Sequence, residues 1–253
     1  MSTDFDLTGK TCLVTGATGG LGRQFALALA RAGADVVVTG RRAELLDSLV
    51  DEIGTAGGRA HALSLDVTDM AAIEQAVGRA EELAGPLWCL VNNSGVARTK
   101  PADAFDEADY DFVMDVNAKG AFFVAQAVGK RMIARGAGGR IINIASIGAL
   151  QPLGQNTLYC MSKAALAQMT RCMARDWARH DICVNAICPG YIRTEMNAAF
   201  FDSDKGQHLY QSWPRRRVGK DTDLNGLLLL LASEQSDFMT GSVILADDGQ
   251  TLA

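Results

Sequence analysis

Short runs of apolar residues alternate along the chain with longer segments in which apolar positions recur at helical spacing. We expect strands at 11–15, 35–39, 60–65, 87–92, 140–145, 182–187 and 242–246. We expect helices at 21–32, 43–56, 70–84, 104–115, 120–135, 157–180 and 222–232. Several strands are unbroken apolar runs (CLVT, VVVT, IINIA), which indicates a sheet covered on both faces. The alternation predicts an α/β fold with a doubly wound, mainly parallel, seven-stranded sheet and helices on both faces.

A chain of 253 residues is long enough for one α/β domain with a large core or for two small domains. We find no linker, repeat or low-complexity tract, so we expect one domain over 1–253. The segment 194–219 breaks the rhythm and carries Phe200, Phe201, Tyr210 and Trp213 without a clear period. A long irregular segment after a strand is where a substrate lid would lie, and we call it the lid segment.

Composition and charge narrow the choice of partners. Hydrophobic residues make up 48% of the chain and charged residues 21%, and the net charge of −5 favours neither nucleic acid nor an anionic membrane. No apolar run approaches the ~20 residues of a membrane span, and the polar start lacks a signal-peptide core. The six cysteines and three histidines show no metal-ligand or secreted-disulfide pattern. We therefore expect free thiols, no metal and a cytoplasmic location.

A glycine-rich turn follows the first predicted strand and opens the first predicted helix. It reads TGATGGLG over 15–22, with the spacing G-x-x-x-G-x-G. Gly16 permits a sharp turn, Gly20 permits close approach of a pyrophosphate, and Gly22 permits the helix to pack closely. Free N–H groups at the start of the helix favour phosphate. We expect a dinucleotide site here, against the alternative of an ordinary glycine-rich loop.

A second group of residues consists of Ser146, Tyr159 and Lys163. Tyr159 and Lys163 are four residues apart in a predicted helix and therefore share a face. A tyrosine has a reference pKa of about 10, and lowering it to about 7 takes roughly 4 kcal/mol. A nearby cation favours the phenolate, and Ser146 follows a strand that could bring its hydroxyl alongside. Taken alone, Tyr-x-x-x-Lys favours the simpler interpretation of a half-buried helix residue.

The order of the motifs reverses that preference. Along the chain they are the glycine-rich turn, Asp66 and Val67 after the third strand, Asn-Asn-Ser-Gly over 92–95, Asn117, Ser146, Tyr159, Lys163, Pro189 and Gly190 after the sixth strand, and Thr194. In this order and spacing the chain resembles the short-chain dehydrogenase/reductase family over 7–252. The resemblance implies a Rossmann fold and a nicotinamide-dependent oxidoreductase.

The resemblance also implies catalytic roles. Tyr159 would be the general acid in reduction and the general base in oxidation. Lys163 would hold the nicotinamide ribose and lower the pKa of the tyrosine. Ser146 would donate a hydrogen bond to the substrate oxygen, and Asn117 would order a water molecule that relays protons from Lys163. The alternative for Asn117 is a residue that caps a helix kink.

The resemblance assigns a larger set of residues to the cofactor. Asp66 would accept from the adenine amino group, although a strand-end turn residue is the alternative. Ser94 stands where the family usually has alanine. The implied set is Gly16, Thr18, Gly20, Leu21, Gly22, Arg41, Asp66, Val67, Asn93, Ser94, Gly95, Tyr159, Lys163, Pro189, Gly190, Ile192 and Thr194.

The end of the second strand decides between the two nicotinamide cofactors. NAD enzymes commonly place an acid there for the ribose 2′-hydroxyl, whereas a 2′-phosphate calls for arginine. This chain reads Val-Thr-Gly-Arg-Arg over 38–42, without an acid. Arg41 could stack on adenine and bind the phosphate. We expect NADP(H) to be preferred and NAD(H) to be the alternative; whether Arg41 or Arg42 decides stays open.

We expect hydride transfer between the nicotinamide and a ketone or secondary alcohol, which is the chemistry of a carbonyl reductase or alcohol dehydrogenase. The resemblance leaves two more specific alternatives, a 3-oxoacyl-thioester reductase and a gluconate-type sugar-acid dehydrogenase, and a remote third, a non-catalytic sensor of NADP(H). The candidate substrate residues are Ser146, Gly148, Leu150, Gln155, Tyr159, Tyr191, Met196, Phe200 and Trp213. Their mainly apolar character favours a hydrophobic or cyclic ketone over a polyol.

Two further features concern the end of the chain. Three arginines over 215–217 could receive an anionic substrate or could simply be solvated. The resemblance implies a homotetramer built from the helices predicted at 120–135 and 157–180 and from the last strand. Asp248 departs from the family's usual Asp-Gly-Gly and would alter the local turn.

Overall fold

A computed structural model describes residues 5–195 and 197–252 of the chain. The described residues form one seven-stranded sheet of order β3-β2-β1-β4-β5-β6-β7, in which every neighbouring pair is parallel. The strands are β1 (Thr11–Val14), β2 (Asp35–Gly40), β3 (Arg59–Ser64), β4 (Leu87–Asn92), β5 (Gly139–Ile144), β6 (Ile182–Pro189) and β7 (Val243–Ala246). The predicted doubly wound fold is confirmed, with every predicted strand present within two residues of its expected ends.

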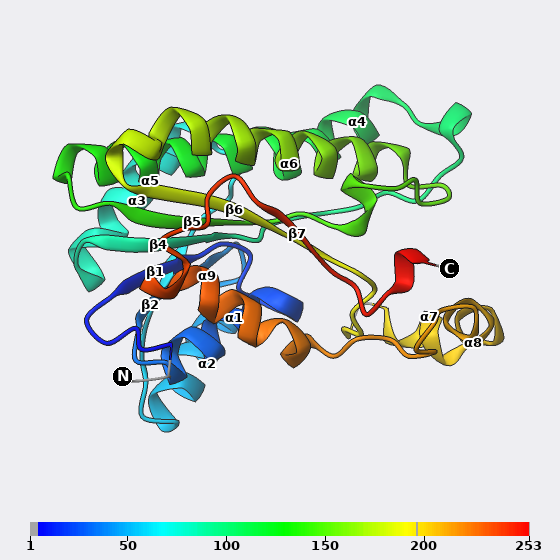
Figure 1. Ribbon diagram of the computed structural model, residues 1–253, viewed down its shortest axis with the longest axis horizontal. Helices are drawn as coiled ribbons and strands as arrows, with labels where there is room; N and C mark the ends of the chain where they lie inside the picture. Colours follow the sequence, from blue (N-terminus) through cyan, green and yellow to red (C-terminus); the bar gives the residue numbers. More distant parts are fainter. Residues whose placement is uncertain (1–4, 196, 253) are drawn as a thin grey trace.

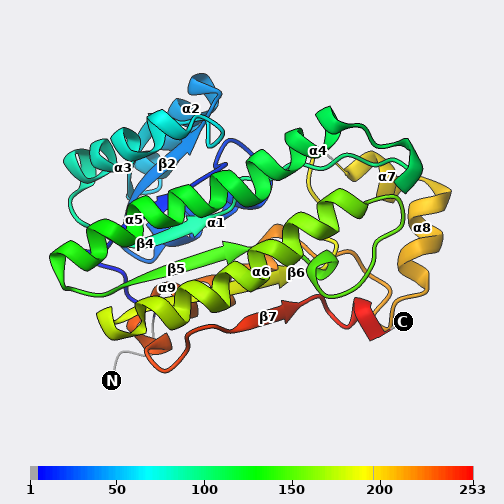
Figure 2. The same cartoon turned by 90° about the horizontal axis from the view of Figure 1, so that it is seen from above.

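Helices cover both faces of the sheet. They are α1 (Gly20–Arg31), α2 (Ala43–Thr55), α3 (Met70–Ala84), α4 (Glu107–Met114), α5 (Ala121–Arg135), α6 (Thr157–Trp177), α7 (Ala198–Asp202), α8 (Asp204–Gln211) and α9 (Asn225–Ala232). In Figure 1, α1, α2 and α9 lie below the sheet, and α3, α5 and α6 lie above it. Figure 2 shows α5 and α6 side by side over the strands. No helix in the described part of the chain is both long and apolar enough to span a membrane.

The two faces of the sheet bury separate hydrophobic cores. One core joins side chains of α1, α2 and α9, such as Phe25, Leu49 and Leu228, to the strands. The other joins α3, α5 and α6 to the opposite face, with Val77 and Met132 among its fully buried members. Because the central strands are covered on both sides, their sequences are continuous apolar runs.

The edge strands depart from the prediction of a sheet buried throughout. β3 and β7 are largely half-exposed along their length, whereas β5 and β6 are buried at every position. The reason is topological, since an edge strand has a neighbour on one side alone.

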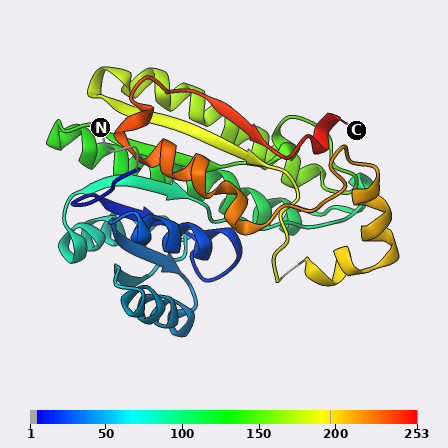
Figure 3. The ribbon, with the colours of Figure 1, turned by 60° about the horizontal axis from the view of Figure 1, so that its bottom comes forward.

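Two connections also differ from their predictions. The helices predicted at 104–115 and 120–135 are joined without a break by the π-helix Asp115–Gly120. The lid segment, predicted without regular structure, contains the short helices α7 and α8. Figure 3 shows these two helices beyond the ends of the strands, close to the C-terminus.

Candidate active site

The carboxyl end of β5 presents the first functional side chain. Ser146 lies two residues beyond the strand and precedes the short 3₁₀ helix Ile147–Ala149. Its Oγ accepts a hydrogen bond from the Gly148 backbone N–H at 3.0 Å, and it is also hydrogen-bonded to the side chain of Tyr159. Ser146 is 7% exposed, so its hydroxyl is held in place by both partners.

Tyr159 and Lys163 occupy the start of α6, one helical turn apart. Lys163 is 4% exposed, and its Nζ donates to the Ile144 carbonyl oxygen at 2.8 Å. The same Nζ lies 5.7 Å from the centroid of the Tyr159 ring. The structure therefore brings a hydroxyl, a phenol and an amine together where β5 ends.

Burial controls the ionisation of this group. Burial raises the pKa of Tyr159, whereas the hydrogen bond with Ser146 acts in the opposite direction. Burial also lowers the pKa of Lys163 to about 8. In the protein itself the pKa of Tyr159 is therefore raised, which is the opposite of the direction expected from Lys163. The physical reason is that desolvation of the phenolate outweighs a cation that lies over the ring and is itself desolvated.

Asn117 lies in the middle of the π-helix and is fully buried. Its Oδ1 accepts from the Val96 backbone N–H, and its Nδ2 donates to the Val96 carbonyl and to Ser162 Oγ, at 2.8–2.9 Å. Ser162 in turn donates to the Tyr159 carbonyl at 2.7 Å. Asn117 thus joins the loop after β4 to α6. Because both amide hydrogens are used, a water relay would have to use its Oδ1 or its backbone carbonyl.

The loop after β4 brings Asn117 close to Lys163. A Cβ atom on Gly95 would lie 3.3 Å from Lys163 Nζ and 3.5 Å from Asn117 Oδ1. A larger residue at this position would fill the space between the two groups, so Gly95 keeps it open.

The glycine-rich turn is held by the end of β4. Gly16 and Gly20 have φ values of +66° and +53°, which favour glycine. A Cβ atom on Gly22 would collide with the Gly16 carbonyl oxygen and the Asn93 side chain. Asn93 Nδ2 donates to the carbonyl oxygens of Thr15 and Gly16 at 3.0 and 3.2 Å. Its side chain therefore holds the turn in place, whereas the resemblance assigned it to the cofactor.

The start of α1 has the character of an anion site. In the described structure its N-cap, Gly19, makes no side-chain cap, and no acidic residue occupies the first turn. Helix-start N–H groups without a capping side chain are free to bind phosphate. Arg42 Nη2 donates to Thr18 Oγ1 at 2.9 Å and contacts the Thr18 carbonyl at 3.3 Å. These residues fit a pyrophosphate-containing cofactor.

The comparison with known proteins agrees with this arrangement. The family described as short chain dehydrogenase matches residues 10–205. This chain belongs to the short-chain dehydrogenase family. A gluconate 5-dehydrogenase of Gluconobacter oxydans (strain 621H) is 38% identical to it over 250 residues, which cover 98% of this chain and 97% of that protein.

Solved structures resemble this short-chain dehydrogenase over nearly its whole length. A gluconate 5-dehydrogenase from Burkholderia cenocepacia J2315, in complex with NADP and tartrate, has a TM-score of 0.94 and 38% identity, with 98% of each chain covered. A 3-oxoacyl (acyl-carrier-protein) reductase from Agrobacterium tumefaciens C58, with NADP bound, has a TM-score of 0.91 and 32% identity, with 98% of this chain and 96% of that chain covered.

Part of the predicted substrate set of this short-chain dehydrogenase lies around Tyr159. A Cβ atom on Gly148 would lie 3.4 Å from Ser146 Oγ and 3.2 Å from Cys160 Sγ. Tyr191 is close enough to Tyr159 for its charge to contribute to the raised pKa of Tyr159, after burial. The Tyr191 ring stacks on Trp213, with ring centroids 5.3 Å apart.

The rest of the predicted set is less well placed. Leu150 and Phe200 are 50% and 46% exposed, and Gln155 is also exposed. Phe201, which was not among the predicted substrate residues, packs edge-on against Tyr191 and is 2% exposed. Met196 lies outside the described residues.

The turn after β6 joins the catalytic side to the lid segment. A Cβ atom on Gly190 would collide with Gln250 Oε1, which accepts from the Tyr191 backbone N–H at 2.6 Å. A Cβ atom on Gly20 would lie 3.6 Å from Thr194 Cγ2, so the start of the lid segment faces the glycine-rich turn. Ile192, also predicted here, is buried and pairs with Gly219.

Asp66 lies at the turn after β3. Burial works to raise its pKa, but hydrogen bonds from the Thr68 backbone and hydroxyl, together with Arg41, lower the pKa overall. Arg41 Nη1 lies 3.8 Å from Asp66 Oδ2, and 69% of the Arg41 side chain is exposed. The Val67 carbonyl packs against Gly120, where a Cβ atom would lie 2.5 Å away.

Sequence reasoning missed several residues that position this site. Thr15 Oγ1 accepts from the backbone N–H groups of Asn93 and Ser94 at 3.0 Å, and Ser162 connects Asn117 to Tyr159. Gln250 fixes the backbone of Tyr191. Thr15 directly precedes Gly16, and Ser162 lies between Tyr159 and Lys163, so their places in the motifs could have indicated a role.

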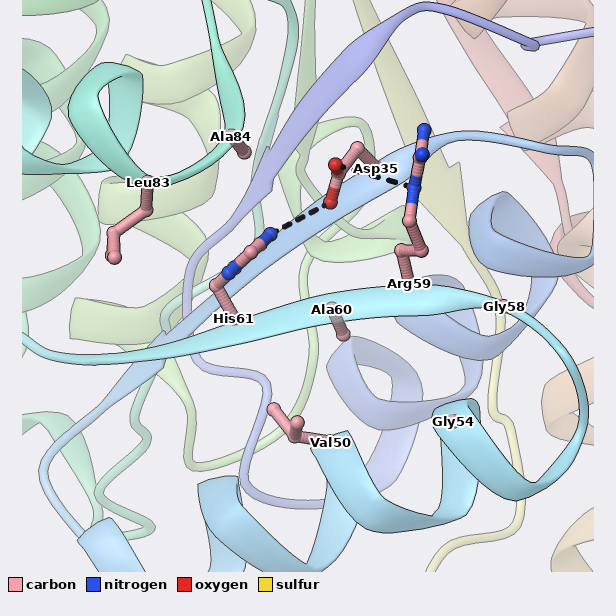
Figure 4. A pocket seen from close by; sticks show the side chains of 9 residues that line it. All are labelled: Asp35, Val50, Gly54, Gly58, Arg59, Ala60, His61, Leu83 and Ala84. Atoms are coloured by element: carbon pink, nitrogen blue, oxygen red, sulfur yellow. Dashed lines mark ion pairs between the residues drawn. The ribbon is translucent and has the colours of Figure 1, made fainter.

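A separate cavity of about 410 Å³ lies at the other end of the sheet (Figure 4). Asp35 and Arg59 open β2 and β3, so the cavity faces the amino ends of these strands. Asp35 contacts His61 Nε2 at 3.0 Å and Arg59 Nε at 3.4 Å. The residues that line this cavity are distant from Tyr159, because the amino ends and the carboxyl ends of parallel strands lie at opposite edges of the sheet.

Proposed function

We propose that the protein is an NADP(H)-dependent oxidoreductase that transfers hydride between the nicotinamide and a ketone or secondary alcohol. The observation that carries this proposal is the convergence of Ser146, Tyr159 and Lys163 at the end of β5. The glycine-rich turn and the uncapped start of α1 supply a fitting anion site. The cofactor supplies the hydride at its nicotinamide C4.

The residues of the chain manage the proton and the substrate oxygen. Tyr159 Oη gives its proton to the carbonyl oxygen in reduction and takes the alcohol proton in oxidation. Ser146 Oγ donates a hydrogen bond to the same oxygen and stabilises the charge that develops on it. Asn117 holds the loop after β4, which carries Gly95 beside Lys163, against α6. Lys163 would hold the cofactor ribose.

Tyr159→Phe tests the reaction class. We expect turnover to fall by roughly 10²- to 10⁴-fold, because the phenol proton is lost while the ring remains. NADPH affinity, measured by fluorescence titration, should stay within about threefold, a difference of under 1 kcal/mol. Tyr110→Phe, at an exposed tyrosine of α4, is the matched control and should leave turnover unchanged. Normal turnover in Tyr159→Phe would refute the mechanism, and a non-catalytic sensor would show no turnover in either protein.

The basic end of β2 supports the choice of NADP(H). Arg42 is tied to Thr18, whereas Arg41 is largely exposed and pairs loosely with Asp66 at 3.8 Å. Arg41 is therefore the better candidate to bind a 2′-phosphate, and related structures contain NADP.

Arg41→Ala should raise the KM for NADPH by about 10- to 100-fold, since a charge-assisted contact is worth ~1.5–3 kcal/mol. The KM for NADH should change by less than about twofold, because NADH lacks the 2′-phosphate. Steady-state kinetics with both cofactors measures the difference, and Arg79→Ala on the exposed face of α3 is the control. An equal effect on both cofactors would assign no phosphate contact to Arg41.

The substrate class is proposed at the level of a ketone or secondary alcohol. Tyr191, Phe201 and Trp213 form an aromatic cluster beside Tyr159, which suits an apolar substrate body. The gluconate 5-dehydrogenase relatives support a sugar acid as the second candidate, and the 3-oxoacyl reductase supports a thioester as the third. NADPH oxidation with one carbonyl compound of each class separates the three.

We also propose a homotetramer in the cytoplasm. All six cysteines are free thiols, which suits a reducing compartment. Phe122 and Phe123 on α5 and Met161 on α6 are exposed apolar side chains on the two helices expected to pair, and Leu245 is exposed on the edge strand β7. Exposed apolar groups of this kind favour contact with another copy of the chain.

A further inference from the structure

The lid segment is fixed at its base. The Arg193 backbone N–H donates to the Gly219 carbonyl at 2.8 Å, and the Gly219 N–H donates to the Tyr191 carbonyl at 3.0 Å. Between these two points the chain forms α7 and α8 and returns through Trp213. Trp213 is 5% exposed and stacks on Tyr191, so the returning limb of the lid segment forms a wall beside the catalytic group.

A carboxylate from the turn after β7 (residues 247–250, the C-terminal turn) holds the returning limb of the lid segment (residues 212–219). Asp248 Oδ1 accepts from Arg215 Nη1 at 2.7 Å, and Asp248 Oδ2 lies 2.6 Å from Arg217 Nε. Arg217 also donates from Nη1 to Asp223 Oδ2 at 2.7 Å. The Asp248 side chain is 15% exposed, whereas the side chains of Arg215 and Arg217 are 66% and 38% exposed, so both ion pairs remain open to screening by salt.

The same turn touches the lid segment at neighbouring positions. A Cβ atom on Gly249 would lie 3.7 Å from Pro214, and Gln250 holds both backbone groups of Tyr191. The C-terminal turn therefore contacts the chain at both partners of the Tyr191–Trp213 stack. Gln250 binds the backbone of Tyr191, and Asp248 binds the arginines that follow Trp213. Figures 1 and 3 show the end of the chain, drawn in red, on the same side of the molecule as the lid helices.

The backbone of Asp248 suggests that the carboxylate is retained for its contacts. Its φ of +58° is in the left-handed region, where a residue with a Cβ atom pays a free-energy cost that glycine avoids. Asp is among the residues best able to adopt this conformation, and here one of its oxygens accepts a hydrogen bond from Arg215 while the other forms an ion pair with Arg217.

We propose that Asp248 is a positioning residue that latches the returning limb of the lid segment onto the C-terminal turn. The latch keeps Trp213 against Tyr191 and so sets the affinity for substrate beside Tyr159, which rests on the proposed function. Together with Asp223, Asp248 neutralises Arg215 and Arg217, so these arginines do not form the receptor for an anionic substrate that the sequence left open. The exposed Arg216 takes no part in the latch.

Hydrogen–deuterium exchange of the intact protein tests the latch without any substrate. Asp248→Gly removes the carboxylate and also relieves the backbone cost, so the variant should fold normally. Peptides that cover 198–217 should exchange about fivefold faster, the effect expected for losing ion pairs worth about 1 kcal/mol, while peptides of the sheet stay unchanged. Glu234→Gln, which breaks an exposed ion pair with Lys10, is the matched control. Unchanged exchange at 198–217 in Asp248→Gly would overturn the latch.

Kinetics test the consequence for substrate. In Asp248→Gly, the substrate KM should rise about fivefold while kcat stays within about twofold, because the chemical groups are untouched. Asp248→Asn, which keeps the shape but loses the charge, should match Asp248→Gly. High salt should raise the KM of the wild type towards the variants' value. An Asn variant that behaves as the wild type would refute an ionic latch, whereas absence of turnover in every protein would refute the proposed function and leave the exchange result standing.

Discussion

Lys163 carries a charge that the fold buries. Its pKa falls from the ordinary value of 10.5 to about 8, because burial removes the ammonium from water. A folded-state pKa below the unfolded value means that the unfolded chain binds more protons between about pH 8 and 10.5. The free energy of unfolding should therefore rise with pH across this window as the buried amine becomes neutral.

Lys163→Met tests this sign. Relative to the variant, the wild type should gain about 2 kcal/mol of unfolding free energy between pH 7 and pH 9.5, because the folded protein loses the proton of Lys163 near pH 8 while the unfolded chain still holds it. Urea denaturation of both proteins at several pH values measures the gap. Lys130→Met, at an exposed lysine of α5, should show the pH dependence of the wild type. A gap that is constant or shrinks with pH would show that burial does not destabilise the ammonium.

Single residues were predictable where a motif specified the chemistry. Spacing showed that Ser146, Tyr159 and Lys163 could meet, because a helical turn and a strand end fix which groups lie together, and the order of all the motifs made them the candidate site. The direction of the Tyr159 pKa was not predictable, since desolvation depends on everything packed around the ring. The tie between Arg42 and Thr18 likewise depends on side-chain geometry that spacing does not encode.

At the scale of elements, the π-helix Asp115–Gly120 changes the role expected for Asn117. A π-turn inserts an extra residue into a helix and is frequent at functional sites. Here it lies opposite the loop after β4, where Asn117 pairs with both backbone groups of Val96, as a neighbouring strand would. The element therefore couples the loop after β4 to α6.

Asn117→Ala should destabilise the protein by about 1–3 kcal/mol, because it leaves the N–H and carbonyl of the half-buried Val96 without their side-chain partner. Turnover should also fall, since the loop that carries Gly95 loses its tie to α6. Thermal and urea denaturation measure the first effect, and steady-state kinetics measures the second. Asn225→Ala, at the start of α9, is the control and should cost less than about 1 kcal/mol. A loss below that value in Asn117→Ala would mean that water replaces the side chain.

Elements with a strong period were predicted well, and elements set by tertiary contact were not. β1, β2, β4, β5 and β6 are buried as expected, because two covered faces demand apolar side chains on both sides. The edge strand β3, with its sequence RAHALS, needs less apolar surface. The helices α7 and α8 have few buried residues of their own, so their apolar pattern is too weak to reveal them.

For the whole molecule, the order of the strands places the functional groups at one edge. The strands β1 to β3 are added towards one edge of the sheet and β4 to β7 towards the other, so the order of strands reverses between β1 and β4. An open α/β sheet binds ligands at such a crevice. The glycine-rich turn and Asn93 follow β1 and β4, and Ser146 follows the next strand, β5. The site therefore follows from the topology, which the alternation of elements already predicted.

The assembly of the molecule is open to a direct test. Phe122 and Phe123 are each 38% exposed on the face of α5 that lies away from the sheet core, and their rings contact edge-on at 5.2 Å. Burial of such a ring in an interface is worth roughly 2 kcal/mol, and a buried carboxylate in its place is costly. The double variant Phe122→Glu/Phe123→Glu should therefore dissociate the proposed tetramer, as measured by sedimentation velocity. Phe238→Glu, at a fully exposed ring, should leave the assembly intact. A wild-type protein that sediments as a monomer would refute the tetramer. A double variant that stays assembled would show that Phe122 and Phe123 are not in the interface.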